Sequence, residues 1–254
     1  MMTYVNEQTV KFLNGLPFFR DMDPSDVTVF LNTATIRHYA RHQTVFLQDD
    51  PADHFFVIRD GWVKTYRITQ DGEESIRSIL HGGDLFGLAS FFGNADYPYC
   101  AEAVEKSDLI SFSITPLRER TEKKPEIMQR VISSLSREMN RLHLDHEHMT
   151  LMSAPQRVGC LLMQLAPERG PNGCSFRFPY DKSLAAQKLG MKPETFSRAF
   201  LQLKPYGVTV NGPECRIENF DMLAQYCCAH CSAEARDCFN APLKPENQPL
   251  KRVQ

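Results

Sequence analysis

The sequence contains no apolar run of the roughly 18 residues that a membrane-spanning helix requires. Its first residues, MMTYVNEQTVKF, lack the basic start and the apolar stretch of a secretory signal peptide. These absences predict a cytoplasmic protein without a membrane partner. The formal net charge is only −2 at pH 7, which neither indicates nor excludes nucleic acid, because that binding depends on local charge.

Signatures of enzymes are missing as well. We find no phosphate-binding glycine loop, no nucleophile elbow and no arranged pair of catalytic side chains. An enzyme, such as a thiol or iron–sulfur oxidoreductase, therefore has little support. What the sequence does have is an ordinary composition, with 254 residues of which 42% are hydrophobic and 24% charged. Such a chain is long enough for about two domains.

The first half of the chain predicts a β domain preceded by short helices. Helical patterns cover residues 1–35. From about residue 36, short β-branched and aromatic runs alternate with turns, and Asp60-Gly61 and Asp71-Gly72 supply the positive φ that tight hairpins need. Many short strands at this spacing predict a jelly roll, a fold that closes or covers its own sheet edges.

A long amphipathic helix is predicted next. Its apolar positions alternate steps of four and three residues over about three heptads. Packing of this helix on its own β domain is one interpretation. We favour homodimerisation, because the apolar stripe is narrower than the usual core-facing side of a helix. The stripe, which we call the seam, consists of Met128, Ile132, Leu135, Met139, Leu142, His146 and Met149.

The second half predicts a winged helix-turn-helix. One helix ends near Leu165, and two further helical stretches flank Gly190. The segment VTVNGPECRIE then predicts a strand, a turn at Asn211-Gly212 and a second strand. Helix, tight turn, helix and hairpin in this order are the elements of that DNA-binding motif.

Residues 193–203, PETFSRAFLQL, predict a helix with one apolar and one polar side. Pro193 suits the first helical position, where its missing N–H has no cost, although Lys192 is a poor N-cap. The apolar side, which we expect in the core, is formed by Phe196, Phe200 and Leu203.

The polar side of the same helix carries groups that suit the edges of base pairs. Glu194, Ser197 and Arg198 lie at i, i+3 and i+4 and so share one side, which we call the reading face. In a major groove, Arg can bind guanine O6 and N7, Glu can accept from cytosine N4, and Ser can contact a base or a phosphate. The alternative is a solvated helix side with an internal Glu194–Arg198 ion pair.

Positive charge is concentrated around this helix. Between Lys182 and Lys204 there are five cationic side chains and one carboxylate, which gives a local charge of +4. Phosphates of nucleic acid attract such local cations. We assign this contact to Lys182, Lys188 and Lys192. Together with the turn, the hairpin and the pairing helix, the pattern predicts a DNA-binding protein.

A small jelly roll, a long dimer helix and a winged helix-turn-helix with the residues ETFSR resemble the CRP/FNR family of bacterial transcription regulators, over roughly residues 16–225. The E-x-x-S-R pattern is similar to the FNR-like side of that family. The resemblance implies that the reading face binds an inverted repeat of TTGAT-like half-sites in double-stranded DNA, and that RNA polymerase is a further partner. The implied fold class is α+β, with a cyclic-nucleotide-binding-like jelly-roll sensor over 16–120, a dimerisation helix over 121–150 and a winged helix-turn-helix over 151–225. Outside the region of resemblance, the sequence itself predicts a cysteine cluster over 226–240 and, because of its three prolines and few apolar residues, a disordered tail over 241–254.

The jelly roll of this family often binds a cyclic nucleotide, but the pattern for that ligand is incomplete here. It has a glutamate soon after G-D-x-x-G and an Arg-Ser pair for the phosphate. This chain keeps Gly83, Asp84 and Gly87, but Leu88 follows in place of a carboxylate, and residues 97–100, YPYC, hold no cation. A buried phosphate without a cation would cost several kcal/mol. We therefore expect no cyclic nucleotide, and a roll that serves as scaffold or as a pocket for an apolar molecule.

The cysteines are the other candidate for a sensor. Four of the eight lie within twelve residues, in CCAHCSAEARDC, and none precedes Cys100. Such spacing brings several thiolates to one metal ion or cluster. Many FNR proteins carry the cysteines of a 4Fe–4S cluster near the N-terminus, whereas one branch carries them after the winged helix, with an aspartate from the dimer helix. This chain resembles that branch in placement, although the spacing differs. The implied ligands are Cys227, Cys228, Cys231 and Cys238, with Asp145 or His230 as further candidates.

The cysteines leave several interpretations open. Structural zinc at the same residues, a redox-responsive disulfide, and thiols that bind nothing all fit the spacing. Some nitric-oxide-sensing relatives bind haem in the β domain, but no histidine in this sequence marks a haem site. The leading hypothesis is a homodimeric regulator whose redox or gas signal acts through a 4Fe–4S cluster. A regulatory subunit whose roll binds a protein is a further class, and a specific footprint on a palindrome would separate the two.

Overall fold

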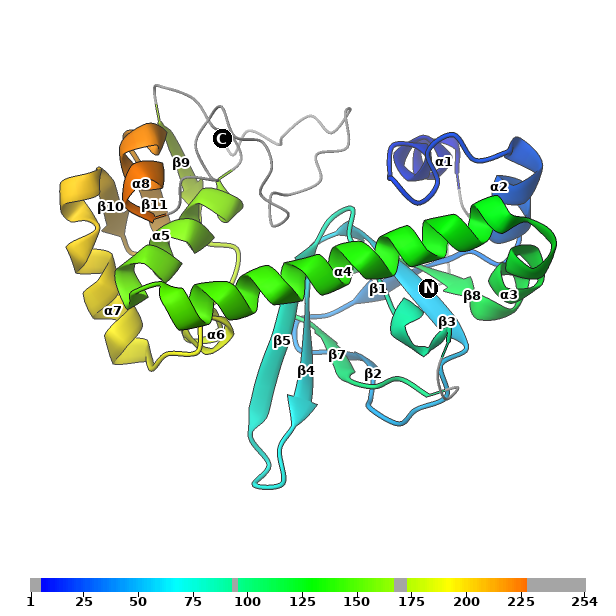
Figure 1. The fold of residues 1–254 in the computed structure, drawn as a ribbon, viewed down its shortest axis with the longest axis horizontal. Helices are drawn as coiled ribbons and strands as arrows, with labels where there is room; N and C mark the ends of the chain where they lie inside the picture. Colours follow the sequence, from blue (N-terminus) through cyan, green and yellow to red (C-terminus); the bar gives the residue numbers. More distant parts are fainter. Residues whose placement is uncertain (1–5, 93–95, 167–172, 228–254) are drawn as a thin grey trace. The chain divides into compact units, whose positions relative to one another are not determined.

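A computed structural model describes residues 6–92, 96–166 and 173–227 of the chain (Figure 1). These residues form two compact units, and the division falls within one long helix, between Glu138 and Met139. The first unit is a β roll with helices at both of its chain ends, and the second unit combines helices with a small sheet.

Two four-stranded antiparallel sheets make up the roll of the first unit (Figure 1). Their strand orders are β1-β8-β3-β6 and β2-β7-β4-β5. Most neighbours in a sheet are far apart in the sequence, so the chain passes repeatedly from one sheet to the other, as in a jelly roll. The strands are β1 (Thr35–Tyr39), β2 (Thr44–Phe46), β3 (His54–Asp60), β4 (Trp62–Ile68), β5 (Glu74–His81), β6 (Leu85–Phe86), β7 (Cys100–Ala103) and β8 (Ser107–Ser113).

The two glycine turns predicted as hairpins differ in the structure. Gly72 joins β4 to β5, which are paired antiparallel strands, so that hairpin is confirmed. Gly61 joins β3 to β4, which belong to different sheets, so the prediction of a hairpin at Asp60-Gly61 is wrong. The φ of Gly61 is +91°, and a Cβ there would lie 2.3 Å from Ser107 Oγ. Glycine is needed here for a tight corner between two sheets.

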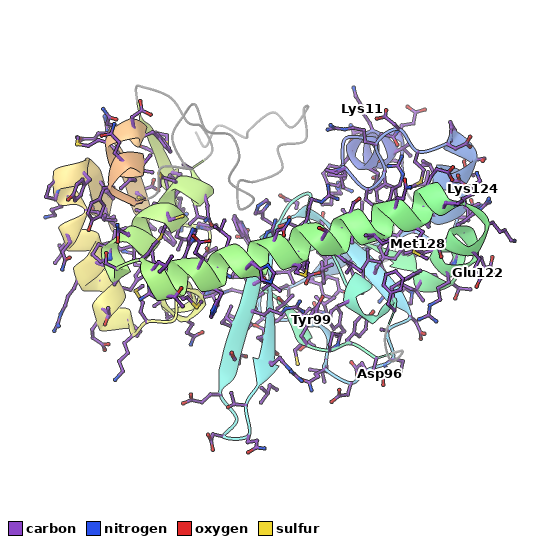
Figure 2. The ribbon with its side chains drawn as sticks, viewed as in Figure 1. Lys11, Asp96, Tyr99, Glu122, Lys124 and Met128 are labelled. Atoms are coloured by element: carbon purple, nitrogen blue, oxygen red, sulfur yellow. The ribbon has the colours of Figure 1, made fainter. Side chains whose placement is uncertain are left out.

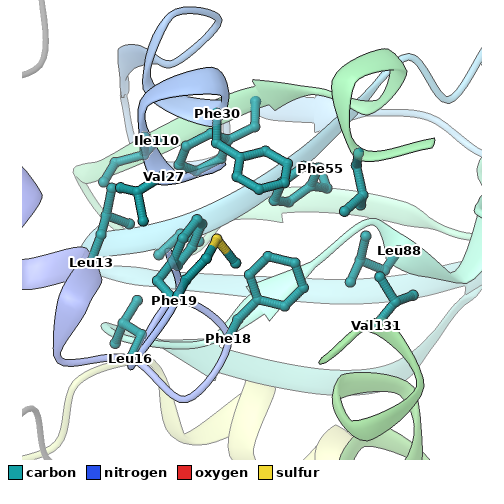
Figure 3. Packing of buried hydrophobic residues seen from close by; sticks show 14 of the residues in the cluster. Leu13, Leu16, Phe18, Phe19, Val27, Phe30, Phe55, Leu88, Ile110 and Val131 are labelled. Atoms are coloured by element: carbon teal, nitrogen blue, oxygen red, sulfur yellow. The ribbon is translucent and has the colours of Figure 1, made fainter. Parts of the chain in front are cut away.

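Aromatic side chains fill the roll in two clusters. One is contributed by both sheets and includes Phe46 and Tyr97, whose ring centroids are 3.7 Å apart. The other lies where the N-terminal helices cover the roll, and Figure 3 shows Phe18, Phe19 and Phe30 gathered near Phe55 of β3. Burial of these large rings helps to hold the helices on the roll.

Polar side chains start the short helices of the first unit. Asn6 accepts a hydrogen bond from the Thr9 N–H, and Asp23 accepts one from the Ser25 N–H, ahead of Pro24 at the first helical position. These caps occupy backbone donors that would otherwise lack a partner within the helix. The helices are α1 (Glu7–Asn14), α2 (Pro24–Leu31), the 3-10 turn η1 (Leu88–Ser90) and α3 (Ile114–Lys123).

Helix α4 spans Pro125–Leu151 and contains 27 residues. Ile127 and Val131, one turn apart, are buried in the same cluster as the N-terminal helices, and Leu135 packs partly against it. Met128, labelled in Figure 2, follows the buried Ile127 and is the first residue of the seam. One side of α4 is therefore occupied by its own roll.

The second unit carries a three-stranded antiparallel sheet with the order β10-β11-β9. A helix after the predicted wing, α8, is an element that the sequence analysis did not anticipate. The observed architecture confirms the predicted α+β class with an N-terminal β roll. In the ranges that the structure describes, none of the helices combines the length and the hydropathy of a membrane-spanning segment. The elements are α5 (Ala154–Leu165), β9 (Cys174–Arg177), α6 (Lys182–Lys188), α7 (Pro193–Gln202), η2 (Lys204–Tyr206), β10 (Val208–Asn211), β11 (Glu214–Ile217) and α8 (Phe220–Cys227).

Candidate nucleic-acid interface

Helix α7 has the two sides that the sequence predicted. Phe196 is 1% exposed and Leu203 is fully buried, with Phe200 at 8%. The ring of Phe178 meets those of Phe196 and Phe200 edge-on, at centroid distances of 6.4 and 6.1 Å. These contacts fix the rotation of α7 about its axis, so the opposite side must face outward.

The reading face is exposed along the outer side of α7. Glu194, Ser197 and Arg198 all lie in exposed positions. The Ser197 hydroxyl donates to the Pro193 carbonyl oxygen at 3.0 Å and keeps its acceptor lone pairs. Lys192 is the N-cap and makes no side-chain cap hydrogen bond, as expected. A carboxylate, a hydroxyl and a guanidinium thus project side by side.

A turn with Gly190 at φ +61° joins α6 to α7. The carbonyl of Leu189, at the end of α6, accepts a hydrogen bond of 2.6 Å from Arg157 Nη1 of α5. The guanidinium is attracted by the partial negative charge at the C-terminal end of α6. α5 therefore holds the turn that sets the start of α7.

The three predicted phosphate-binding lysines lie in three different settings. Lys192 is exposed beside the first turn of α7. Lys182 Nζ donates to the Gly212 carbonyl oxygen at 3.0 Å and lies 5.7 Å from the centroid of the Phe200 ring. It therefore joins the start of α6 to the tip of the wing.

Lys188 is paired with Asp145, a residue that the sequence suggested as a cluster ligand. Lys188 Nζ donates to Asp145 Oδ2 at 2.5 Å, and the two side chains are 14% and 19% exposed. The structure thus brings together one predicted DNA contact and one predicted ligand. The ion pair ties α6 to the C-terminal part of α4, and it competes with a phosphate for Lys188 and with a metal for Asp145.

The wing adds cations that the sequence reasoning missed. Arg177 of β9 and Arg216 of β11 are exposed, and Thr209 of β10 is the cross-strand partner of Arg216. In contrast, Cys215 is fully buried, and burial raises the pKa of its thiol to about 12. The alternation of buried and exposed residues in β11 is the signal that places Arg216 on the outer side.

Of the clustered cysteines, the structure describes Cys227 alone. Its side chain is 5% exposed at the end of α8, and its Sγ lies so close to Gly159 of α5 that a Cβ on Gly159 would be 2.3 Å away. Tyr226 stacks on Tyr206 with ring centroids 3.8 Å apart, which fixes α8 on the unit. Cys228, Cys231, Cys238 and His230, like the predicted tail 241–254, lie outside the described residues.

The other described cysteines lie in the roll, α5, β9 and β11, and of these Cys174 and Cys215 lie on neighbouring strands and interact. Cys100 is in the roll, Cys160 is buried in α5 with its Sγ 3.9 Å from His148 Nδ1, and Cys174 is in β9. In the part of the chain that the structure describes, no group of three or more His, Cys, Asp or Glu side chains could hold a metal ion.

The seam on α4 remains largely exposed. Ile132 is 53% exposed, Met139 52% and Met149 43%. His146 is also exposed, whereas Met128 and Leu142 are half-buried. Leu135 is a member of the seam that also packs partly against the roll. The seam thus presents exposed apolar side chains at Ile132, Met139 and Met149.

The residues of the incomplete nucleotide pattern are part of the core of the roll. Leu88 is 2% exposed and Tyr97 4%. Tyr99, labelled in Figure 2, is 1% exposed, and its hydroxyl accepts a hydrogen bond of 3.3 Å from the Gly87 N–H. Burial raises the pKa of Tyr99 far above its usual value.

Arg77 is a cation near Tyr99 that sequence reasoning missed. Its guanidinium lies 4.5 Å from the Tyr99 ring centroid, and its Nη2 donates to Glu138 Oε1 of α4 at 2.9 Å. β4 pairs Thr65 with Ser78 but Tyr66 with Ile76, so Arg77 is the extra residue of a bulge. A bulge redirects a side chain, and no sequence pattern marked it.

Known proteins resemble this chain over most of its length. The family described as Cyclic nucleotide-binding domain matches residues 36–123. The Fumarate and nitrate reduction regulatory protein of Escherichia coli K12 is 30% identical over 190 residues, which cover 72% of this chain and 74% of that protein. The CRP-like cAMP-activated global transcriptional regulator of Mycobacterium tuberculosis is 26% identical over 211 residues, with coverages of 82% and 94%.

A solved structure agrees with these relatives. A Ruegeria pomeroyi protein provisionally assigned to cyclic nucleotide binding has a TM-score of 0.65 and 32% identity, and the match covers 88% of this chain and 99% of that one. The similarity therefore extends through the β roll, the long helix and the helices of the second unit. A β roll and a helix-turn-helix joined by one long helix, with regulators among the relatives, establish that this chain belongs to the CRP/FNR family of transcriptional regulators.

Proposed function

We propose that the chain is a homodimeric regulator that reads an inverted repeat of TTGAT-like half-sites through Glu194, Ser197 and Arg198. The observation that carries this proposal is the exposed reading face of α7, opposite a fully packed aromatic side. Arg198 binds guanine in the bidentate manner, Glu194 accepts from a cytosine amino group, and Ser197, whose hydroxyl donates to Pro193, accepts at a neighbouring base.

Cations around α7 position the protein on the DNA backbone. Lys192 lies beside the N-terminal turn of α7, whose backbone N–H groups also favour a phosphate. Arg177 and Arg216 are exposed on the sheet of the wing. These groups contact phosphates without distinguishing sequence, and they make the affinity depend on salt concentration. Specificity comes from the reading face.

Dimerisation through the seam follows from its exposed apolar side chains. Ile132 and Met139 are seven residues apart, which is one heptad of a paired helix. A second copy of α4 would cover them. A two-fold dimer places its two α7 helices in successive major grooves, about 34 Å apart, so the site must be a palindrome. RNA polymerase is the further partner that the family implies.

The experiment for this proposal is selection of bound sequences from random duplex DNA, followed by footprinting. We expect an inverted repeat whose half-site centres are about 10 base pairs apart, with protection on one face of the duplex. Recovery of no common sequence, or of a single unrepeated half-site bound by a monomer, would contradict it.

The signal is proposed to act through the cysteines at 227–238, with a 4Fe–4S cluster as the group that they hold. Such a cluster, when bound, supplies a centre that responds to oxidants and gases. Support comes from the close sequence spacing and from the packing of α8, which ends at Cys227 against α5. The cysteine cluster therefore begins at a residue that is packed on the DNA-binding unit. A change in the ligands of the cluster can shift Cys227, and with it α5 and the turn between α6 and α7.

A cyclic nucleotide is not the proposed signal. Tyr97 stacks on Phe46 inside the roll, and Leu88 stands where the family pattern has a carboxylate. Arg77 is matched by the charge of Glu138, so a phosphate would have to displace that ion pair. Calorimetric titration with cyclic AMP should show no heat of binding, and a saturable heat would reverse this part of the proposal.

A further inference from the structure

We propose that Leu201 is a further specificity-determining residue, which contacts the C5-methyl group of a thymine in the major groove. The inference rests on the proposed function, because it requires α7 to lie in that groove. Leu201 has no place in the E-x-x-S-R pattern, and neither the core nor the wing uses it. Its position on α7 carries the argument.

Leu201 lies in the last turn of α7 and, around the helix axis, points to the middle of the outer side. At 3.6 residues per turn, its side chain is displaced by only about 20° from that of Glu194 around the helix axis, between Ser197 and Arg198. It follows Ser197 by four residues and Arg198 by three, so it is their neighbour on the next turn. The reading face therefore continues directly into an aliphatic side chain.

The exposure of Leu201 sets it apart from the other large apolar residues of α7. It is 61% exposed, whereas Phe196 and Phe200 are 1% and 8% exposed. Leu203, at the cap after the helix, is fully buried. An exposed leucine alone carries no information. At the C-terminal end of a polar side that faces a proposed ligand, Leu201 becomes the apolar part of that surface.

The chemistry of the major groove supplies a matching group. Thymine presents a C5-methyl group there, and apolar side chains distinguish it from the other bases. Carboxylate, hydroxyl and guanidinium groups cannot read a methyl group by hydrogen bonding. Four residues of helix rise by about 6 Å, which is close to two base-pair steps along the duplex. Leu201 therefore meets a base about two steps from the one beside Ser197.

The test replaces thymine by deoxyuridine, which keeps the base pair and removes only the methyl group. On the selected repeat, each thymine of the half-site is replaced in turn, symmetrically in both halves, and dissociation constants are measured for wild type and Leu201→Ala. We expect wild type to lose about fourfold affinity per methyl group at one thymine position, or about 16-fold for both halves. Leu201→Ala should bind the thymine and deoxyuridine sites equally at that position.

Two further variants serve as controls. Leu201→Met keeps an apolar side chain of similar volume and should retain most of the discrimination. Met222→Ala removes an exposed apolar side chain, 41% exposed, from α8 of the same unit and should leave the thymine-to-deoxyuridine ratio unchanged. Circular dichroism checks folding, and Leu201→Gln carries the test if the alanine variant does not fold.

The outcomes separate this inference from the function on which it rests. A wild type that selects no repeat overturns both. A wild type that binds a repeat but shows no methyl-dependent position overturns the inference alone. So does a Leu201→Ala variant with the same thymine-to-deoxyuridine ratio as wild type at every position, because the contact would then come from another residue.

Discussion

Arg198 is the residue whose replacement tests base reading most directly. Its side chain is exposed on the outer side of α7. Arg198→Ala removes a bidentate contact, so we expect a loss of about 1–3 kcal/mol in binding free energy on the specific repeat and a relaxed preference at one base pair. Competition between the repeat and random DNA at one salt concentration measures both effects.

Lys192→Ala is the matched control for Arg198→Ala. It removes a cation beside the same helix, but from a position suited to phosphate. The affinity of the Lys192→Ala variant should fall by the same factor for all DNA sequences. The slope of log affinity against log salt concentration should become shallower by about 1. If Arg198→Ala behaves in this way too, base reading by Arg198 is contradicted.

Gly159 allows α5 and α8 to pack closely. A Cβ there would lie 2.3 Å from Cys227 Sγ and 3.2 Å from Leu223 Cδ1, both from buried residues. Gly159→Ala should therefore lower the free energy of unfolding of the second unit by about 1–3 kcal/mol, measured in urea. In a Cys227→Ala background, which lacks the sulfur, the further change Gly159→Ala should lower the free energy of unfolding by less than it does in wild type. Strict additivity would show that crowding at the sulfur is not the cause.

At the scale of the element, α4 divides its surface between the roll and the seam. Ile132 and Met139 are exposed, whereas Leu135 also packs on the roll. Ile132→Glu/Met139→Glu should place like charges between paired helices and yield monomers with weak DNA binding, while the roll keeps its stability. Sedimentation velocity measures the oligomeric state.

A control for charge uses another side of the same helix. Gln129 and Ser133 are exposed and lie away from both the seam and the buried positions of α4. Gln129→Glu/Ser133→Glu adds the same charge and should leave a dimer intact. An intact dimer in the Ile132→Glu/Met139→Glu variant would reject the assignment of the seam.

The ion pair between α4 and α6 separates two interpretations of Lys188. Lys188→Ala leaves Asp145 without this cation in a half-buried position, so it should lower the free energy of unfolding by about 1–3 kcal/mol. The exchange Asp145→Lys/Lys188→Asp should restore most of the stability. If DNA affinity returns with stability, Lys188 positions α6. If stability returns but all DNA sequences bind more weakly, Lys188 contacts phosphate.

At the scale of the whole molecule, the cysteines after α8 should link a signal to DNA binding. Protein purified without oxygen should contain iron and sulfide, and Cys231→Ser and Cys238→Ser should lose both and change affinity for the repeat. Cys174→Ser, which alters a cysteine in β9, should do neither. Zinc without sulfide would replace the iron–sulfur proposal. If both cysteine variants bind the repeat with the affinity of wild type, with and without air, the cysteines are not the sensor.

Local patterns allowed a large part of this protein to be predicted. The three-and-four spacing of Phe196, Phe200 and Leu203 placed these residues in the core, because a helix presents the same side every three to four residues. Asn211-Gly212 marked the turn between β10 and β11 for a similarly local reason, the positive φ of Gly212. The β roll and the helix-turn-helix followed from such short-range rules.

Local patterns and the family resemblance were thus enough to predict the class of fold, the outer side of α7 and the family. Four features became visible only in the folded chain: Asp60-Gly61 turns between sheets, a bulge directs Arg77 to Glu138, Lys188 pairs with Asp145, and α8 packs Cys227 against Gly159. The last three features are contacts between residues of different elements, and the first depends on which sheet each strand joins. Local propensity sets the conformation of a segment, but strand register and helix packing determine which distant side chains meet, and no local pattern encodes them.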